Sequence, residues 1–184
     1  GEVLKAGFIK SRPLANFLAS NRDAVLKRET KALSHIIKAS LEVKRDVVGK
    51  DEKETGGLRR ILNYGHTIGH AVELLARFHI SHGFCVAIGM SAEARLAVRL
   101  GILKDSARIE MDQLIASYGL PLAIPKNLKP SALADAMLLD KKSTDGKIQF
   151  SLCSEIGRME SAGGTYSVSA PKKLILEILR DAQS

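Results

Sequence analysis

Two histidines stand four residues apart in the segment Gly65-His66-Thr67-Ile68-Gly69-His70. In a helix this spacing places both imidazoles on one face. A pair of imidazoles on one helix face can bind zinc, and the spacing is equally compatible with one imidazole on a metal and the other on a substrate. Gly65 and Gly69 each cost a helix roughly 1 kcal/mol relative to alanine. We therefore expect another group to approach this helix face closely.

A third histidine, His82, lies in the stretch Ser81-His82-Gly83, in a loop before the next expected helix. A histidine in a turn can fold back on the preceding helix, and three histidines together with a distant carboxylate would complete a site for a divalent cation such as zinc. Alternatively, His82 caps the next helix. His35 and His79 stand in ordinary amphipathic context and are assigned to structure or surface.

Apolar residues recur at three- and four-residue spacing over most of the chain, which predicts a mainly helical protein. The helical pattern covers residues 14–48 with a break at 21–23, then 58–78, 86–100, 106–118, 132–139 and 170–182, with a loop at 52–57. The period changes at Ile148, Phe150 and Leu152, which alternate with polar residues and predict a small β element near residues 147–153. No glycine-rich turn follows a strand pattern, so the sequence shows no means of holding NAD.

Composition narrows the class of partner. The formal net charge of +8 favours an anionic partner, but aromatic residues are only 4% and the basic residues are dispersed, which argues against nucleic acid. A small anionic metabolite is the alternative to a merely solvated basic surface. The sequence contains no apolar run long enough for a transmembrane helix and no signal-peptide pattern. Cys85 and Cys153 stand in unrelated contexts, which favours reduced thiols. We expect a cytoplasmic protein of one domain that binds neither nucleic acid nor membrane.

Five motifs resemble those of one enzyme family. Residues 58–73 (LRRILNYGHTIGHAVE) and 82–90 (HGFCVAIGM) are similar to the signature stretches of 3-dehydroquinate synthases. Three further pieces follow in the family's order, namely residues 2–5, residues 44–48 before Asp51-Glu52, and Asp140-Lys141-Lys142 before Asp145-Gly146-Lys147. The resemblance implies that residues 1–184 form the mainly α, multi-helix C-terminal domain of dehydroquinate synthase type.

The same resemblance implies roles for individual residues. Glu2, His66 and His82 match the family's ligands to Zn²⁺, for which Co²⁺ is an alternative. The positions that match the substrate pocket are Lys5, Lys44, Arg59, Asn63, His70, Lys141 and Lys142, of which Lys5, Lys44 and His70 are the catalytic candidates. The implied substrate is 3-deoxy-D-arabino-heptulosonate 7-phosphate, whose carboxylate and phosphate suit lysine and arginine.

The implied reaction belongs to the shikimate pathway of aromatic amino-acid biosynthesis. NAD⁺ oxidises a ring hydroxyl, phosphate is eliminated, the ketone is reduced again, and an intramolecular aldol step gives 3-dehydroquinate. NAD is recycled and not consumed in this sequence, so the cofactor carries the hydride while the protein orients it.

The chain departs from the family's pattern in three respects. Phe84 stands where the family most often has glutamate, and the loop at Gly56-Gly57 is one residue longer than usual. The family's N-terminal NAD-binding domain is absent, so we expect it in the remainder of a longer protein, or in a separate chain. The full-length enzyme is expected to be a homodimer, and the isolated chain to be inactive with weak metal affinity.

Two other functions are compatible with the motifs. One is a related sugar phosphate cyclase that acts on another sugar phosphate. The other is a catalytically inert helical domain that binds partners or anions.

Overall fold

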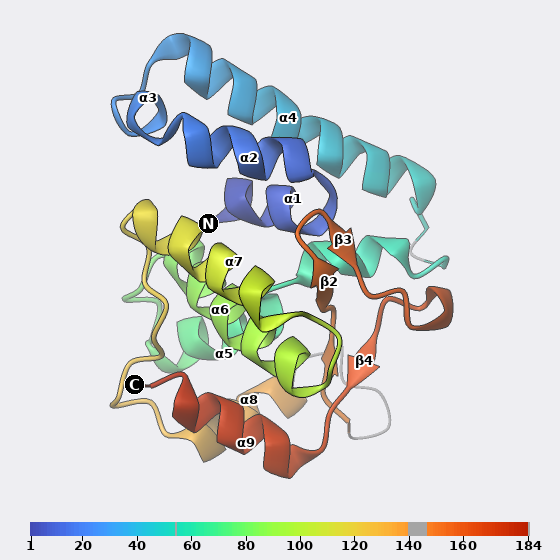
Figure 1. Ribbon diagram of the computed structural model, residues 1–184. Coiled ribbons are helices and arrows are strands. Elements are labelled where there is room, and N and C mark those ends of the chain that lie inside the picture. The colour runs from blue at the N-terminus through green and yellow to red at the C-terminus, as the bar shows by residue number, and fades with distance from the viewer. Residues whose placement is uncertain (54, 140–146, 184) are drawn as a thin grey trace.

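The computed structural model describes residues 1–53, 55–139 and 147–183, and helices dominate it (Figure 1). The α-helices are α1 (Glu2–Lys10), α2 (Arg12–Ser20), α3 (Arg22–Leu26), α4 (Thr30–Lys50), α5 (His66–Leu75), α6 (His82–Arg99), α7 (Asp105–Ser117), α8 (Pro130–Leu139) and α9 (Lys172–Asp181). Two 3-10 helices, η1 (Leu58–Asn63) and η2 (Ala162–Gly164), complete the helical part. The expected mainly α fold is confirmed.

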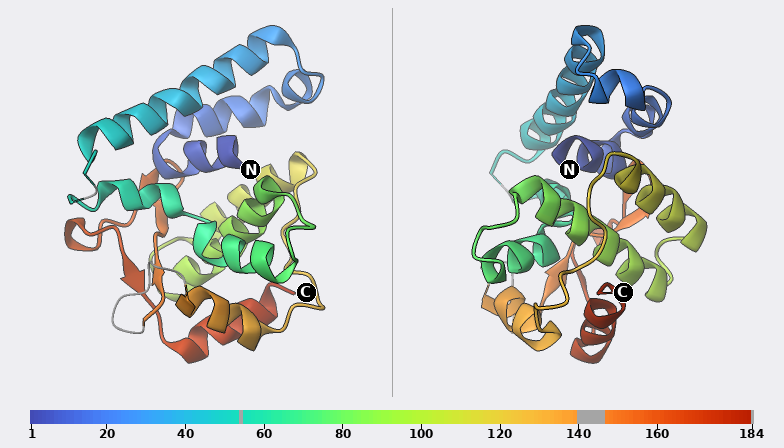
Figure 2. Two further views of the ribbon diagram at one scale, coloured as in Figure 1. Left: turned by 180° about the vertical axis from the view of Figure 1, so that it is seen from behind. Right: turned by 90° about the vertical axis from the view of Figure 1, so that its left-hand side faces the viewer.

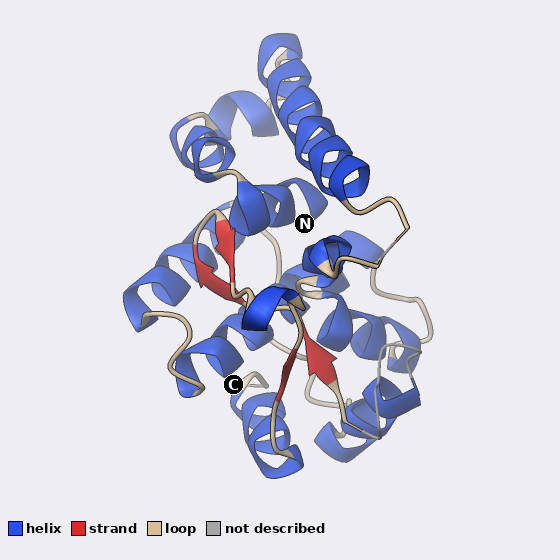
Figure 3. Cartoon of the chain, turned by 90° about the vertical axis from the view of Figure 1, so that its right-hand side faces the viewer, coloured by secondary structure: helices blue, strands red, loops and turns tan. Residues whose placement is uncertain are grey.

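In the part of the chain that the structure describes, four short strands form two separate antiparallel pairs (Figure 3). β1 (Gln149–Phe150) pairs with β4 (Val168–Ser169), and β2 (Cys153–Glu155) pairs with β3 (Arg158–Met159). β1 falls within the β element predicted near residues 147–153. The alternation there predicts a half-buried strand, but Ser151 is buried as well as its apolar neighbours. Its hydroxyl lies within hydrogen-bonding distance of two carbonyl oxygens, those of Arg60 at 2.8 Å and Tyr166 at 3.0 Å, either of which can accept its proton.

The helices form two groups (Figure 2). Helices α1, α2 and α4 lie together on one side of the molecule, and α5 to α9 lie on the other. Helix α6 is the centre of the second group, since nearly every residue from Cys85 to Ala97 is buried and α5, α7, α9 and β2 all pack against it. No helix among the described residues is both long enough and apolar enough to cross a membrane.

Helix α1 was not predicted by the periodicity. Every residue from Leu4 to Ile9, including Lys5, is buried. Because neighbouring elements cover the helix on all sides, no alternation of polar and apolar faces marks it in the sequence.

The continuous helix predicted over residues 58–78 is wrong. The chain leaves η1 at Asn63, turns at Tyr64 and Gly65, and begins α5 at His66. Gly65 has a φ of 77°, a left-handed conformation that favours glycine, and a Cβ here would lie 2.6 Å from Cγ of Met90. The turn at Gly65 therefore makes His66 the first residue of α5.

Helices α5 and α6 cross without room for a side chain between them. A Cβ on Gly89 of α6 would lie 1.9 Å from the carbonyl oxygen of Gly65 and 2.8 Å from the amide nitrogen of Gly69. The close approach expected at the glycines around the histidines is therefore confirmed, and the approaching group is the backbone of α6.

The helical stretch expected after the break at 21–23 is divided once more, since α3 ends at Leu26 and α4 begins at Thr30, and the remaining boundaries are shifted by a few residues. His82 is not in a loop but is the first residue of α6, and α9 begins at Lys172 instead of residue 170. Such shifts are small because the apolar period that defines each helix is unaffected by how its first turn is capped.

Candidate metal centre and substrate pocket

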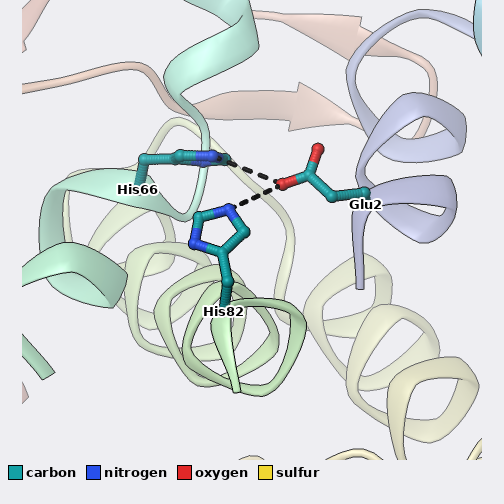
Figure 4. A group of neighbouring side chains, drawn as sticks. All are labelled: Glu2, His66 and His82. Carbon is teal, nitrogen blue, oxygen red and sulfur yellow. Dashed lines mark ion pairs between the residues drawn. The ribbon is translucent and has the colours of Figure 1, made fainter. Parts of the chain in front are cut away.

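Glu2, His66 and His82 converge from three helices (Figure 4). Glu2 lies in the first turn of α1, His66 begins α5 and His82 begins α6. Oε1 of Glu2 lies 3.3 Å from Nε2 of His66 and 3.4 Å from Nε2 of His82. The ligand atoms of the three side chains all lie within 4.8 Å of one another.

The donor set fits a divalent cation that accepts nitrogen and oxygen ligands. Two ligand atoms of a tetrahedral zinc ion, each about 2.1 Å from it, are about 3.4 Å apart. The separations of 3.3 and 3.4 Å between Glu2 and the two imidazoles match that edge. Three protein ligands also leave a coordination position for a substrate oxygen, as catalytic zinc requires.

Each imidazole has an acceptor beside its Nδ1. Nδ1 of His66 lies 3.1 Å from the carbonyl oxygen of Tyr64, and Nδ1 of His82 lies 3.1 Å from Oε2 of Glu73. With a cation bound at Nε2, each neutral imidazole would carry its proton on Nδ1 and donate it to this acceptor. The Nε2 lone pairs would then point to the cation on the side of Glu2.

Lys5 holds the other oxygen of Glu2. Its Nζ lies 2.9 Å from Oε2 of Glu2 and donates to the carbonyl oxygen of Leu62 at 2.8 Å. Burial acts to raise the pKa of Glu2, but the hydrogen bonds from His66 and Lys5 outweigh it and hold the pKa well below its ordinary value. Glu2 is therefore an anion at neutral pH.

A cavity of about 750 Å³ opens beside these residues, between α1, α4 and η1. The predicted residues that line it are Glu2, Lys5, Lys44, Arg59, Asn63, His66 and His82. The cations from α1, α4 and η1 give the cavity the charge that an anionic ligand requires. The structure thus brings together seven of the predicted site residues.

Asp51 positions Arg59 at this cavity. The buried carboxylate of Asp51 accepts hydrogen bonds from the backbone amides of Gly56 and Arg59 at 2.8 and 2.9 Å. These bonds lower the pKa of Asp51. The side chain of Arg59 donates to the carbonyl oxygen of Glu52 at 3.2 Å, which fixes one side of its guanidinium.

His70 does not line the same cavity. Its ring centroid is 5.0 Å from that of His66 and 5.9 Å from that of His82. However, His70 lines a smaller cavity of about 310 Å³ together with Phe78 and Leu139. The predicted residues Lys141 and Lys142 lie outside the described residues.

Two carboxylates near the site were not predicted. Glu93 is completely buried and accepts hydrogen bonds from the amides of Gly65 and Ile68 at 2.7 and 3.2 Å, so it anchors the first turn of α5. The sequence could have identified Glu93, because it is the single acidic residue among residues 85–97. Glu73 follows His70 by three positions on the same helix face, a spacing that could have identified it.

The remaining histidines lie away from this centre. His35 is exposed and stacks on Phe17 with a centroid distance of 4.0 Å, and His79 is exposed after the end of α5. Both agree with the predicted structural or surface roles.

Known proteins resemble this chain in sequence and in fold. The family model described as 3-dehydroquinate synthase C-terminal matches residues 1–143. A 3-dehydroquinate synthase of Thermodesulfovibrio yellowstonii is 42% identical over 160 residues, which are 86% of this chain and 44% of that protein. The chain spans about half the length of the curated relatives that it matches.

Two solved structures share the fold. ValA, a 2-epi-5-epi-valiolone synthase from Streptomyces hygroscopicus subsp. jinggangensis 5008 with NAD⁺ and Zn²⁺ bound, is 19% identical with a TM-score of 0.84, covering 98% of this chain and 49% of that chain. A 2-deoxy-scyllo-inosose synthase complexed with carbaglucose-6-phosphate, NAD⁺ and Co²⁺ is 24% identical with a TM-score of 0.81 and the same coverage. The family match and the 42% identity together show that this chain belongs to the 3-dehydroquinate synthase C-terminal family.

Proposed function

We propose that this chain is the metal-binding and substrate-binding half of a 3-dehydroquinate synthase. The whole enzyme would convert 3-deoxy-D-arabino-heptulosonate 7-phosphate to 3-dehydroquinate and phosphate, in the shikimate pathway. The observation that carries the proposal is the convergence of Glu2, His66 and His82 beside a cavity lined by Lys5, Lys44 and Arg59. The membership of the family and the names of the curated relatives support the choice of reaction.

The metal in this proposal is Zn²⁺, or Co²⁺, held by Glu2, His66 and His82. Solved structures of the same fold carry one or the other of these ions together with NAD⁺. When bound, the cation would act as a Lewis acid that lowers the pKa of a substrate hydroxyl and polarises a carbonyl. The anionic Glu2 contributes the negative charge of the ligand set.

The cationic side chains of the cavity would bind the substrate. Lys5 is held rigidly between Glu2 and the carbonyl of Leu62, so its ammonium can stabilise negative charge on a substrate oxygen near the metal without reorganising. Lys44 and Arg59 would bind the carboxylate and phosphate, and the planar guanidinium of Arg59 can make two parallel hydrogen bonds. The side-chain amide of Asn63 would donate a hydrogen bond to one of the same anionic groups.

The remaining predicted roles extend the proposal beyond the described cavity. His70, Lys141 and Lys142 would contact the substrate from the side of α5 and from the segment after α8. NAD would be bound by an N-terminal domain outside this chain, and the whole cytoplasmic enzyme would be a homodimer.

The test is phosphate release from 3-deoxy-D-arabino-heptulosonate 7-phosphate by the full-length protein, supplied with NAD⁺ and Zn²⁺ or Co²⁺. We expect turnover by that protein and none by the 184-residue chain alone. His66→Ala should abolish metal binding and turnover, whereas His79→Ala, the same change at an exposed histidine, should leave both unchanged. The absence of phosphate release from the metal- and NAD-loaded protein would count against this function.

One alternative is a related sugar phosphate cyclase. It is supported by the similarity in fold to a 2-epi-5-epi-valiolone synthase and a 2-deoxy-scyllo-inosose synthase. Sugar phosphates that lack the carboxylate of the heptulosonate separate the two functions. Under our proposal the cationic cavity requires both anionic groups, so carboxylate-free substrates should release little phosphate. The reverse preference would establish the alternative.

A further inference from the structure

His66 and His82 are held in place by different kinds of partner. The side chain of His66 is only 13% exposed, and its Nδ1 faces a backbone carbonyl. The side chain of His82 is 43% exposed at the first residue of α6, and its Nδ1 faces a side chain, that of Glu73. The orientation of the His82 ring therefore depends on a group that can be changed by mutation.

We propose that Glu73 is a positioning residue for the metal centre. By accepting the hydrogen bond from Nδ1–H of His82 at 3.1 Å, Glu73 keeps Nε2 directed at Glu2 and strengthens the imidazole as a ligand. Glu73 acts only through His82, and the inference rests on the metal site of the proposed function.

The surroundings of Glu73 suit this role. It lies in the last turns of α5, whose first residue is His66, so one rigid helix carries both a ligand and the partner of another ligand. Its side chain is 18% exposed, and reduced access of water strengthens its hydrogen bond to His82. Phe84, two residues after His82 in the sequence, has no hydrogen-bonding group in its side chain, so it cannot take over the role of Glu73.

A second cation is the competing explanation for the same carboxylate. The ligand atoms of His70, Glu73 and His82 also lie within 4.8 Å of one another. However, a neutral imidazole has one N–H and one lone pair. If Nε2 of His82 gives its lone pair on the side of Glu2, Nδ1 carries the proton and cannot also bind a cation. We therefore expect one cation per chain, with Glu73 as hydrogen-bond acceptor.

The experiment is a titration of the full-length protein with Co²⁺, followed by the visible absorption bands of the bound ion. Loss of the partner of a metal-bound histidine typically costs 10–100-fold in metal affinity, so Glu73→Ala should raise the Kd by about that factor and change the intensity of the bands. Glu73→Gln keeps an acceptor oxygen without the charge and should raise the Kd by less than Glu73→Ala.

The matched control is Glu177→Ala. Glu177 also forms an ion pair, with Arg99 at 2.8 Å, but it lies on α9 away from the histidines. Its substitution should leave the Kd and the absorption bands unchanged. Circular dichroism checks that each variant is folded. If Glu73→Ala does not fold, the nearly isosteric Glu73→Gln supplies the test.

The outcomes separate this inference from the proposed function. Full-length wild-type protein that binds no Co²⁺ in a manner dependent on His66 would overturn both. Wild-type binding with an unchanged Kd in Glu73→Ala would overturn only the role of Glu73. Two equivalents of Co²⁺ per chain, with one lost in Glu73→Ala, would likewise overturn it in favour of a second cation site.

Discussion

Substitution of Glu93 by alanine should destabilise the protein and its metal centre together. The carboxylate of Glu93 is inaccessible to solvent and accepts the amide protons of Gly65 and Ile68 in the first turn of α5. Alanine would leave both amides buried and without their acceptor. The negative charge that stabilises the N-terminus of α5 would also be lost.

The expected loss of stability follows from these two bonds. Hydrogen bonds to a charged group contribute about 1.5–3 kcal/mol each, so losing two costs about 3–6 kcal/mol. Removing the buried charge offsets part of this cost, and we expect a net loss of about 4 kcal/mol. In urea, with a slope of about 2 kcal/mol per molar, the midpoint of unfolding would fall by about 2 M.

Equilibrium unfolding by urea, followed by circular dichroism, measures this change. Glu93→Gln retains one acceptor oxygen and should lose about half as much. Glu110→Ala is the control, because Glu110 forms an exposed ion pair with Arg12 at 2.8 Å, and such pairs contribute about 1 kcal/mol or less. A loss below about 1 kcal/mol in Glu93→Ala would refute the reasoning that this carboxylate holds the first turn of α5.

Three further predictions concern packing, pH and thiol reactivity. Gly89→Ala would place a Cβ against the carbonyl of Gly65, so it should destabilise the protein by at least about 1–3 kcal/mol in the same urea assay. The lowered pKa of Asp51 means that its stabilising contribution is present above pH 4 and is lost as the pH falls through the folded-state pKa. The stability difference between wild type and Asp51→Asn should therefore shrink from pH 6 to pH 3. Burial raises the pKa of Cys85 to about 11 and that of Cys153 further, so a thiol reagent at pH 8 should label both only after unfolding.

The helices that the sequence predicts are those with one face exposed to solvent. Helices such as α4 and α7 have charged residues between their apolar ones, and the 3.6-residue period is visible. Helix α1 is buried on all sides, so its residues carry no such period. The break before α5 also escapes the pattern, because Tyr64 and Gly65 are placed by the backbone of α6, which is distant in sequence.

The candidate site divides in the same way. Resemblance to a family identifies Glu2, His66 and His82, and the structure places them within reach of one ion. Glu73 and Glu93 act through a few hydrogen bonds between helices, and these depend on how α5 and α6 cross. Sequence spacing alone cannot show that Glu73 faces His82, or that Glu93 faces the first turn of α5.

A cation at this centre would tie together positions 2, 66 and 82 of the chain. Helix α1 is otherwise joined to α5 and α6 by packing and by the contacts of Glu2 with His66 and His82, so the ion would be a removable cross-link between the two groups of helices. Because binding to the folded state shifts the folding equilibrium, the population of opened molecules would fall as free metal rises. Proteolysis after Lys10, the last residue of α1, would then be faster after chelation, and the lifetime of the protein in a cell would depend on the supply of metal.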